Sequence, residues 1–300
     1  NSGQTKFYIY GILNIRDYYR HPRNSTSLWS TLGVIMSWKE VLGRVSFSNC
    51  DPIFHGLEGS WGILPAPPAW LTGHVIRKDC LTAPIPSADY AEYHNQLVLI
   101  PDLGIVSRGD VGSVLLFGTR PLESMRDIAI PSDSSTSKKL LRWILNNRGI
   151  DPKTIEMGPD ISSMLESCDG ALLIGDRALS AASRNPETVQ LDLGADWTRI
   201  TGLPMVFGVF ATRKDSPMDI VLRARNDMLE QYTKFKQDEE WRNEVIMATS
   251  LNSGLSESRI SEYFSREVEN ILDTEAIKGL ELFLHEACGM EAAVEWVRLD

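Results

Sequence analysis

Residues 169–181 read DGALLIGDRALSA, and they give the clearest fold signal in the chain. A run of apolar and small residues leads into Gly175 and Asp176, and a helix-like run follows. This pattern is typical of a buried strand, a tight turn and a helix. The turn would place a carboxylate and backbone N–H groups at the end of a buried strand. No nucleophile, metal-ligand or phosphate-loop motif surrounds it, so the rest of the sequence must explain it.

The same strand, turn and helix pattern recurs on both sides of this stretch. GRVSFS (43–48) alternates as a strand that ends at Asn49, and CLTAPIP (80–86) is a short strand before a helix capped by Ser87. The stretch 127–149 reads as a strand, a Ser/Thr-rich turn and a helix that ends at a glycine. Short strands that alternate with helices predict a mostly parallel sheet. The tail 217–300 is predicted to be mainly helical.

Two similar strand-like stretches flank the central part of the chain. VGSVLLFG (111–118) and MVFGVFA (205–211) both combine small and apolar residues. We interpret them as paired connections between two lobes, with a ligand in the cleft and hinge closure around it. The sequence therefore predicts an α/β, two-lobed, periplasmic-binding-protein-like (type II) fold with a helical C-terminal portion.

The predicted domain limits follow from these connections. The first α/β lobe spans 43–120 and is completed by 213–300, and the second α/β lobe spans 121–212. Residues 1–42 form an atypical N-terminal extension, because this segment is rich in Tyr, Ser and Asn and lacks an initial Met. Basic residues precede the short apolar patch LGVIMSW (32–38), so a targeting segment is the alternative interpretation.

Composition excludes several classes of function. The net charge of −10 disfavours nucleic acid, and it leaves local dipoles to bind an anionic ligand. No apolar stretch is long enough to span a membrane. The four cysteines fit no zinc-binding spacing, and no other metal-ligand motif is present, so no metal is expected. We expect free, buried thiols in a reducing compartment and hence a cytoplasmic protein.

Polar residues gather where the predicted strands end and helices begin. In open α/β sheets ligands bind outside the carboxyl ends of strands, and helix N-termini favour carboxylates. The four polar turns at these strand ends, given below, together predict one anion-binding cleft. A purely structural role as helix caps is the alternative for Asn49, Ser87, Ser135 and Asp176. The turns are Ser48–Asn49, Pro86–Ser87, Ser135–Thr136–Ser137 and Gly175–Asp176.

Several stretches, in order, resemble the chorismate dehydratases of the futalosine route to menaquinone. The most specific are LLIGDRAL (172–179) and TGLPMVFGVFA (201–211), and the resemblance runs from residue 43 to the C-terminus. It implies a lyase that removes water from chorismate and leaves 3-[(1-carboxyvinyl)oxy]benzoate, without a metal or an organic cofactor. The sister 1,4-dihydroxy-6-naphthoate synthase of the same pathway is less similar in these two motifs.

The resemblance and the strand-end pattern together assign roles. Asn49 and Asp176 are the expected catalytic residues, Asp176 either fixing its loop or meeting the departing hydroxyl. No His or Glu in these motifs is an obvious proton acceptor, and the enolpyruvyl carboxylate of chorismate is one alternative. The expected substrate-binding residues are Ser48, Ser87, Ser113, Ser135, Thr136, Ser137 and Gly175.

Two other functions stay open at the level of sequence. One is an enzyme like the naphthoate synthase of the same pathway. The other is a non-catalytic solute-binding protein for a small carboxylate, which has the same fold but normally carries a signal peptide or lipobox. The expected partner is the small-molecule substrate, with no nucleic acid and no membrane, and the sequence leaves the oligomeric state open.

Overall fold

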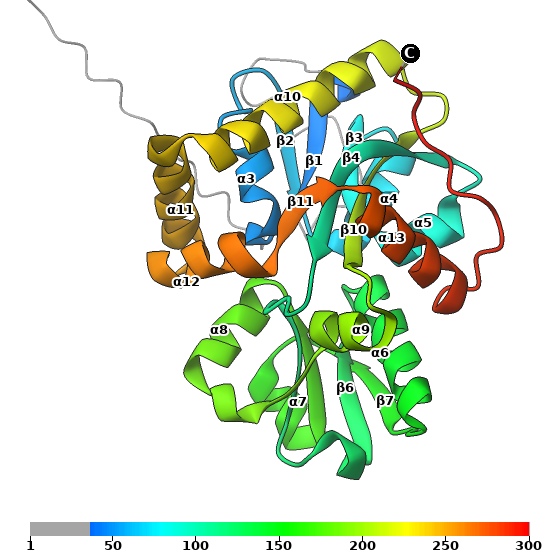
Figure 1. Cartoon of the computed structure of the whole chain (residues 1–300), viewed down its shortest axis with the longest axis vertical. Helices are drawn as coiled ribbons and strands as arrows, with labels where there is room; N and C mark the ends of the chain where they lie inside the picture. Colours follow the sequence, from blue (N-terminus) through cyan, green and yellow to red (C-terminus); the bar gives the residue numbers. More distant parts are fainter. Residues whose placement is uncertain (1–36, 300) are drawn as a thin grey trace, which may run out of the picture. The chain divides into compact units, whose positions relative to one another are not determined.

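The computed structural model describes residues 37–299, in which two β-sheets are each covered by helices (Figure 1). The first sheet has six strands in the order β11-β4-β10-β3-β1-β2. Its strands are β1 (Val41–Val45), β2 (Gly62–Ala66), β3 (Thr82–Pro86), β4 (Leu97–Ser107), β10 (Met205–Arg213) and β11 (Glu269–Leu272).

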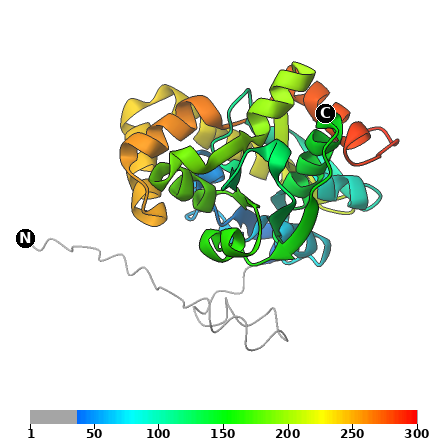
Figure 2. The ribbon, with the colours of Figure 1, turned by 90° about the horizontal axis from the view of Figure 1, so that it is seen from below.

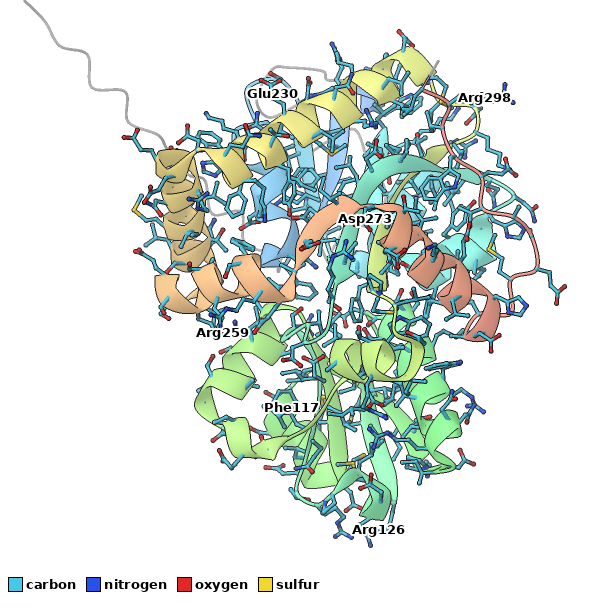
Figure 3. All side chains as sticks on the ribbon, in the orientation of Figure 1. Phe117, Arg126, Glu230, Arg259, Asp273 and Arg298 are labelled. Atoms are coloured by element: carbon cyan, nitrogen blue, oxygen red, sulfur yellow. The ribbon has the colours of Figure 1, made fainter. Side chains whose placement is uncertain are left out.

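The second sheet has five strands in the order β7-β6-β8-β5-β9. Inward-facing residues of β5 and β8, among them Phe117, form its core, and Figure 3 shows Phe117 inside this lobe. Its strands are β5 (Val114–Gly118), β6 (Asp127–Pro131), β7 (Lys153–Met157), β8 (Gly170–Ile174) and β9 (Val189–Asp192).

Both sheets are mixed, so the prediction of a mostly parallel sheet is wrong. The βα alternation holds only where a helix returns the chain, as between β1 and β2 or between β6 and β7, and these pairs are parallel. The first strand after each crossover between the lobes runs antiparallel to its neighbours in the sheet. β10 is antiparallel to β3 and β4, and β5 is antiparallel to β8 and β9.

Helices and short helical turns connect these strands. In the tail, α11 and α12 lie at one side and α13 at the other, in both Figure 1 and Figure 2, and β11 joins them along the edge of the first sheet. The first-lobe helices are α3 (Asp51–Phe54), α4 (Pro68–Ile76), α5 (Ser87–Tyr93), α10 (Met218–Gln237), α11 (Glu239–Ser253), α12 (Glu257–Glu262) and α13 (Thr274–Glu286). The second-lobe helices are α6 (Ser135–Arg148), α7 (Ile161–Ser167), α8 (Asp176–Arg184) and α9 (Leu193–Thr201).

Shorter helical turns complete the description. Four are 3₁₀ turns and the last is a π-helical turn. Ser46 and Phe47 separate the end of β1 from the start of η2. The predicted first strand therefore ends at Val45 rather than at Asn49. These turns are η1 (Trp38–Glu40), η2 (Ser48–Cys50), η3 (Leu122–Ser124), η4 (Pro186–Thr188) and η5 (Tyr263–Glu267).

The structure shifts the predicted domain limits. Val41 and Leu42 belong to β1, so the folded region begins before residue 43, and residues 1–36 of the predicted extension lie outside the described residues. Most of the stretch 111–118 and all of 205–211 are strands of the sheets and not linkers. β5 is a strand of the second sheet and β10 a strand of the first, and the chain crosses between lobes just before each, at 108–113 and 202–204.

One helix, α9, holds both crossovers. Its N-cap Asp192 accepts hydrogen bonds from the backbone N–H groups of Val111 (3.0 Å) and Gly112 (2.8 Å) in the first crossover. Trp197 of α9 is fully buried and donates its indole N–H to the Pro204 carbonyl (3.1 Å) in the second. Because one rigid element contacts both connections, the two lobes are linked through α9 as well as through the chain.

The cysteines and the apolar character of the helices test two further predictions from the sequence. All four cysteines are free, and Cys50, Cys80 and Cys168 are buried while Cys288 is half-buried. Burial raises the pKa of the Cys80 thiol to about 12, so it remains protonated at neutral pH. Within residues 37–299 no helix combines the length and apolar character that crossing a bilayer requires.

Replacing Asp192 with alanine should destabilise the protein more than removal of an ordinary helix cap. Asp192→Ala removes the cap of α9 and the acceptor for two crossover N–H groups, so we expect a loss of at least about 2 kcal/mol in the free energy of unfolding. The matched control is Asp160→Ala, which removes only the exposed cap of α7 and should cost about 1 kcal/mol. Denaturant unfolding measures both, and equal losses would contradict a special role for Asp192 in the crossover.

Candidate functional site

A pocket lies where the ends of strands from both sheets meet. It receives residues from β1, η2, α4, β3, β4 and β10 of the first lobe, and from the first crossover, β5, α6 and β8. Its walls are mostly apolar, and its polar side chains are an amide and four hydroxyls. The lining residues are Val45, Phe47, Asn49, Pro68, Pro84, Ile85, Pro86, Ile105, Val111, Ser113, Val114, Ser134, Thr136, Ser137, Ile174, Gly175, Phe207 and Gly208.

The turn at Gly175 brings the second lobe against the first. Gly175 has φ 62° and ψ −147°, a conformation that residues with a Cβ strongly disfavour. A Cβ at this position would also collide with the ring of Phe47, which comes from the first lobe. Glycine is therefore required at position 175 both by the backbone and by the close approach of the aromatic ring.

Asp176, the next residue, joins the lobes with a hydrogen bond. Its carboxylate accepts the backbone N–H of Ser48 (3.0 Å), the first residue of η2. Burial raises the pKa of the Asp176 carboxyl, and the hydrogen bonds from Ser48 oppose that rise. Asp176 is not among the residues that line the pocket, so its position favours fixing the turn over contact with a departing hydroxyl.

A second contact between the lobes involves the first turn of α6. The backbone N–H of Ala88, in α5, donates to Thr136 Oγ1 (3.1 Å). The hydroxyl of Ser135 donates to the carboxylate of Asp89, and Thr72 donates to the same carboxylate (2.6 Å). Burial raises the pKa of the Asp89 carboxyl. Thr136 accepts at its oxygen, so its own proton remains able to donate into the pocket.

Asn49 projects into the pocket from η2. Its Oδ1 atom is buried and has no hydrogen-bond partner among the described residues. A buried amide oxygen without a partner is unfavourable, so this atom is suited to receive a donor from a ligand. The backbone carbonyl of Asn49 accepts from Asn270 Nδ2 (3.0 Å) on β11, which fixes the position of η2.

The structure brings some of the expected site residues to the pocket and leaves others outside its lining. Asn49, Ser113, Thr136, Ser137 and Gly175 line it, whereas Ser48, Ser87, Ser135 and Asp176 do not. The Ser87 hydroxyl is fully buried and donates to the Val206 carbonyl (2.7 Å), and Ser87 begins α5 without capping it by its side chain. Ser48 and Ser135 serve the contacts between the lobes.

Sequence reasoning missed three prominent lining residues. Ser134 is the N-cap of α6 and accepts from the backbone N–H of Ser137 (3.3 Å), one residue before the predicted helix start. Phe47 alternates with Val45 in the first strand pattern, which could have identified it. Phe207 lies where the register of β10 against β4 shifts, and such irregularities re-aim side chains without a clear sequence signal.

The described lining of the pocket contains no acidic or basic side chain. None of the lining residues within 37–299 carries a titratable side chain. In the same part of the chain, no three His, Cys, Asp or Glu side chains converge as metal ligands would. An anion in this pocket would meet hydroxyl donors and the N-terminal turn of the 14-residue helix α6, whose first N–H groups lack acceptors within the helix.

Substitution of Gly175 should show how much the stability of the protein depends on its close contact with the Phe47 ring. Gly175→Ala forces an unfavourable backbone conformation and displaces the Phe47 ring, so we expect a loss of about 1–3 kcal/mol in the free energy of unfolding. The matched control is Gly158→Ala in the same lobe, where a Cβ would meet open space. Denaturant unfolding compares the two variants. Equal stabilities would show that the turn tolerates a side chain and that the lobes do not depend on it.

Comparisons with known proteins identify relatives of this chain. Residues 41–288 match the model of a family described as menaquinone biosynthesis. The chain is 32% identical over 194 residues to the chorismate dehydratase of Thermus thermophilus, across 59% of this chain and 71% of that protein.

Solved structures share the arrangement of the two lobes. A crystal structure of a protein from Archaeoglobus fulgidus superposes with a TM-score of 0.67 at 17% identity, covering 83% of this chain and 97% of that one. The periplasmic aliphatic sulphonate binding protein of Escherichia coli superposes with a TM-score of 0.58 at 13% identity, covering 87% and 94%. These distant similarities confirm the predicted two-lobed, periplasmic-binding-protein-like fold, and the match over residues 41–288 shows that the chain belongs to the menaquinone biosynthesis family.

Proposed function

We propose that this protein is a lyase that dehydrates chorismate to 3-[(1-carboxyvinyl)oxy]benzoate. The observation that carries the proposal is the pocket itself, which is lined by residues of both lobes, with four hydroxyls and one unpartnered amide oxygen. The similarity to the Thermus thermophilus chorismate dehydratase supports the same reaction. It also favours chorismate over the substrate of a naphthoate synthase.

Neutral donors would bind the two carboxylates of chorismate. Ser113, Ser134, Thr136 and Ser137 carry the pocket's hydroxyls, and three of them belong to the N-terminus of α6. A helix N-terminus adds a positive dipole end to these hydroxyls. The apolar walls lower the local dielectric and strengthen each hydrogen bond to the anion. This arrangement would bind a dicarboxylate although the protein as a whole is acidic.

The reaction needs positioning more than strong acid or base groups. The proton on C3 of chorismate is vinylogous to the ring carboxylate, so the electron pair of the breaking C–H bond delocalises toward that carboxylate. Hydroxide then leaves C4, a C3–C4 double bond forms and the ring becomes aromatic. The proton and the hydroxide together make the water that is lost. Aromatisation supplies the driving force, and fixed dipoles stabilise the charge that develops.

The substrate's own enolpyruvyl carboxylate is our proposed proton acceptor. It is attached through oxygen at C3, so it can reach the C3 proton when it folds back over the ring. The described pocket lining offers no titratable side chain for that role, which supports a base carried by the substrate. Asn49 would then orient the reacting centre, its Oδ1 accepting a hydrogen bond from the C4 hydroxyl.

Turnover of chorismate tests the proposal directly. Purified protein that has been treated with a chelator should convert chorismate to the aromatic enol ether, with a mass loss of one water measured by mass spectrometry. Tight binding of chorismate with no conversion would instead favour a solute-binding protein. Failure to bind chorismate at all would contradict both interpretations.

Two variants should separate binding from chemistry. Thr136→Val removes a donor to a carboxylate and should raise KM by about tenfold to 150-fold with a smaller effect on kcat. Its control, Thr136→Ser, keeps the hydroxyl and should stay close to the wild-type KM. Asn49→Ala should lower kcat on the order of 100-fold while the affinity for a product analogue changes little. The reverse pattern, or near-normal kinetics in both, would reduce these residues to structural roles.

A further inference from the structure

The π-helical turn η5 (Tyr263–Glu267) reaches the first crossover from the helical tail. The backbone N–H of Val268 donates to the Tyr263 carbonyl (3.0 Å), a spacing of five residues. Such wide turns are rare and occur frequently at functional sites. This one extends α12, and the hydroxyl of its first residue is hydrogen-bonded to a residue of the pocket.

Tyr263 is hydrogen-bonded to Ser113, a residue of the pocket lining. Its hydroxyl donates to Ser113 Oγ (3.0 Å), and its side chain is almost completely buried without lining the pocket. Burial raises the pKa of the Tyr263 phenol, so the group remains a neutral donor at physiological pH. The contact joins the tail to a crossover residue 150 positions earlier in the sequence.

Ser113 is held from more than one side. Its backbone carbonyl accepts the N–H of Gly175 (2.7 Å), which ties it to the second lobe. A serine hydroxyl has one proton and two lone pairs. With one lone pair occupied by the Tyr263 proton, rotation of the hydroxyl is restricted and its own proton is left for another acceptor. Ser113 lines the pocket, so a ligand there is a candidate acceptor for this proton.

Glu267, at the other end of the same turn, fixes the neighbouring residue. Its carboxylate pairs with Arg259 (2.8 Å) and lies so close to Gly112 that a Cβ there would collide with it. Figure 3 shows Arg259 at the edge of the first lobe that faces the second. One turn therefore contacts both Gly112 and Ser113, which limits movement of the crossover at the point where it enters the pocket.

We propose that Tyr263 is a positioning residue that holds the Ser113 hydroxyl as a hydrogen-bond donor to a carboxylate of the substrate. The proposal deepens the proposed function and rests on it for the identity of the substrate. It assigns part of the substrate affinity to the helical tail, far in sequence from the strand-end turns.

A double-mutant cycle tests this assignment. We expect Ser113→Ala to raise KM for chorismate about tenfold or more, and Tyr263→Phe to raise it about threefold to tenfold, with kcat little changed in either. Because Tyr263 acts through Ser113, the double variant should be no worse than Ser113→Ala alone. The dissociation constant of 3-(carboxymethoxy)benzoate, measured by calorimetry, should follow the same pattern.

Tyr90→Phe is the matched control. It also removes a buried tyrosine hydroxyl, one that accepts a backbone N–H from Glu295 (2.9 Å) outside the pocket, and it should leave KM unchanged. If Tyr263→Phe does not fold, replacement of Tyr263 by 3-fluorotyrosine gives a stronger donor at the same place. That replacement should lower KM, and an unchanged KM would overturn the proposal.

The possible outcomes separate this inference from the proposed function. If the increase in KM of the double variant equalled the product of the two single increases, the role of Tyr263 would be overturned. A Tyr263→Phe variant with lowered thermal stability and an unchanged KM would overturn it as well. A wild-type protein that binds 3-(carboxymethoxy)benzoate without converting chorismate would refute the dehydration, while the cycle could still be measured from the dissociation constants. An absence of binding by both compounds would overturn both proposals.

Discussion

The hydrogen bond from the Ser48 N–H to the Asp176 carboxylate joins the two halves of the pocket. It links η2, which carries Asn49, to the turn that follows β8, and Gly175 lets the Phe47 ring pack directly beside it. Together with the contacts that the first turn of α6 makes with α5, it holds the strand ends of the two sheets around one cavity. The Gly175–Asp176 turn is therefore a contact point between the lobes, and the Asp176 carboxylate organises the site from outside the pocket lining.

The electrostatics of the pocket follow from these contacts between the lobes. Charged groups such as Asp89 and Asp176 are used to hold the lobes together, and the surfaces left to face a ligand are hydroxyls, an amide and apolar walls. A site of this kind provides fixed dipoles, but its described lining offers no strong protein acid or base. It fits a reaction whose driving force is already present in the substrate, as aromatisation provides.

Local sequence patterns predicted the fold well where the structure depends on neighbours in the chain. The strand, turn and helix at 169–181, the helix opened at Ser135 and the helical tail are of this kind. The antiparallel pairing of β5 and β10, and the contacts made by Tyr263 and Asn270, depend on residues far away in sequence. Ser48 and Asp176 are 128 positions apart, and no local pattern reports that they meet. The candidate site was therefore predicted in part. The predicted set combined residues that line the pocket with residues such as Ser48 and Asp176, which only join the lobes beside it.

The central claim is that this pocket, whose described lining carries no charged side chain, orients chorismate for loss of water. The most direct measurement is a crystal structure of the slowed Asn49→Ala variant soaked with chorismate. The account predicts density for the ligand inside the pocket, with its ring carboxylate within hydrogen-bond distance of the α6 N-terminus and its enolpyruvyl carboxylate folded toward C3. A ligand bound outside the pocket, or bound with C3 turned away from that carboxylate, would contradict it.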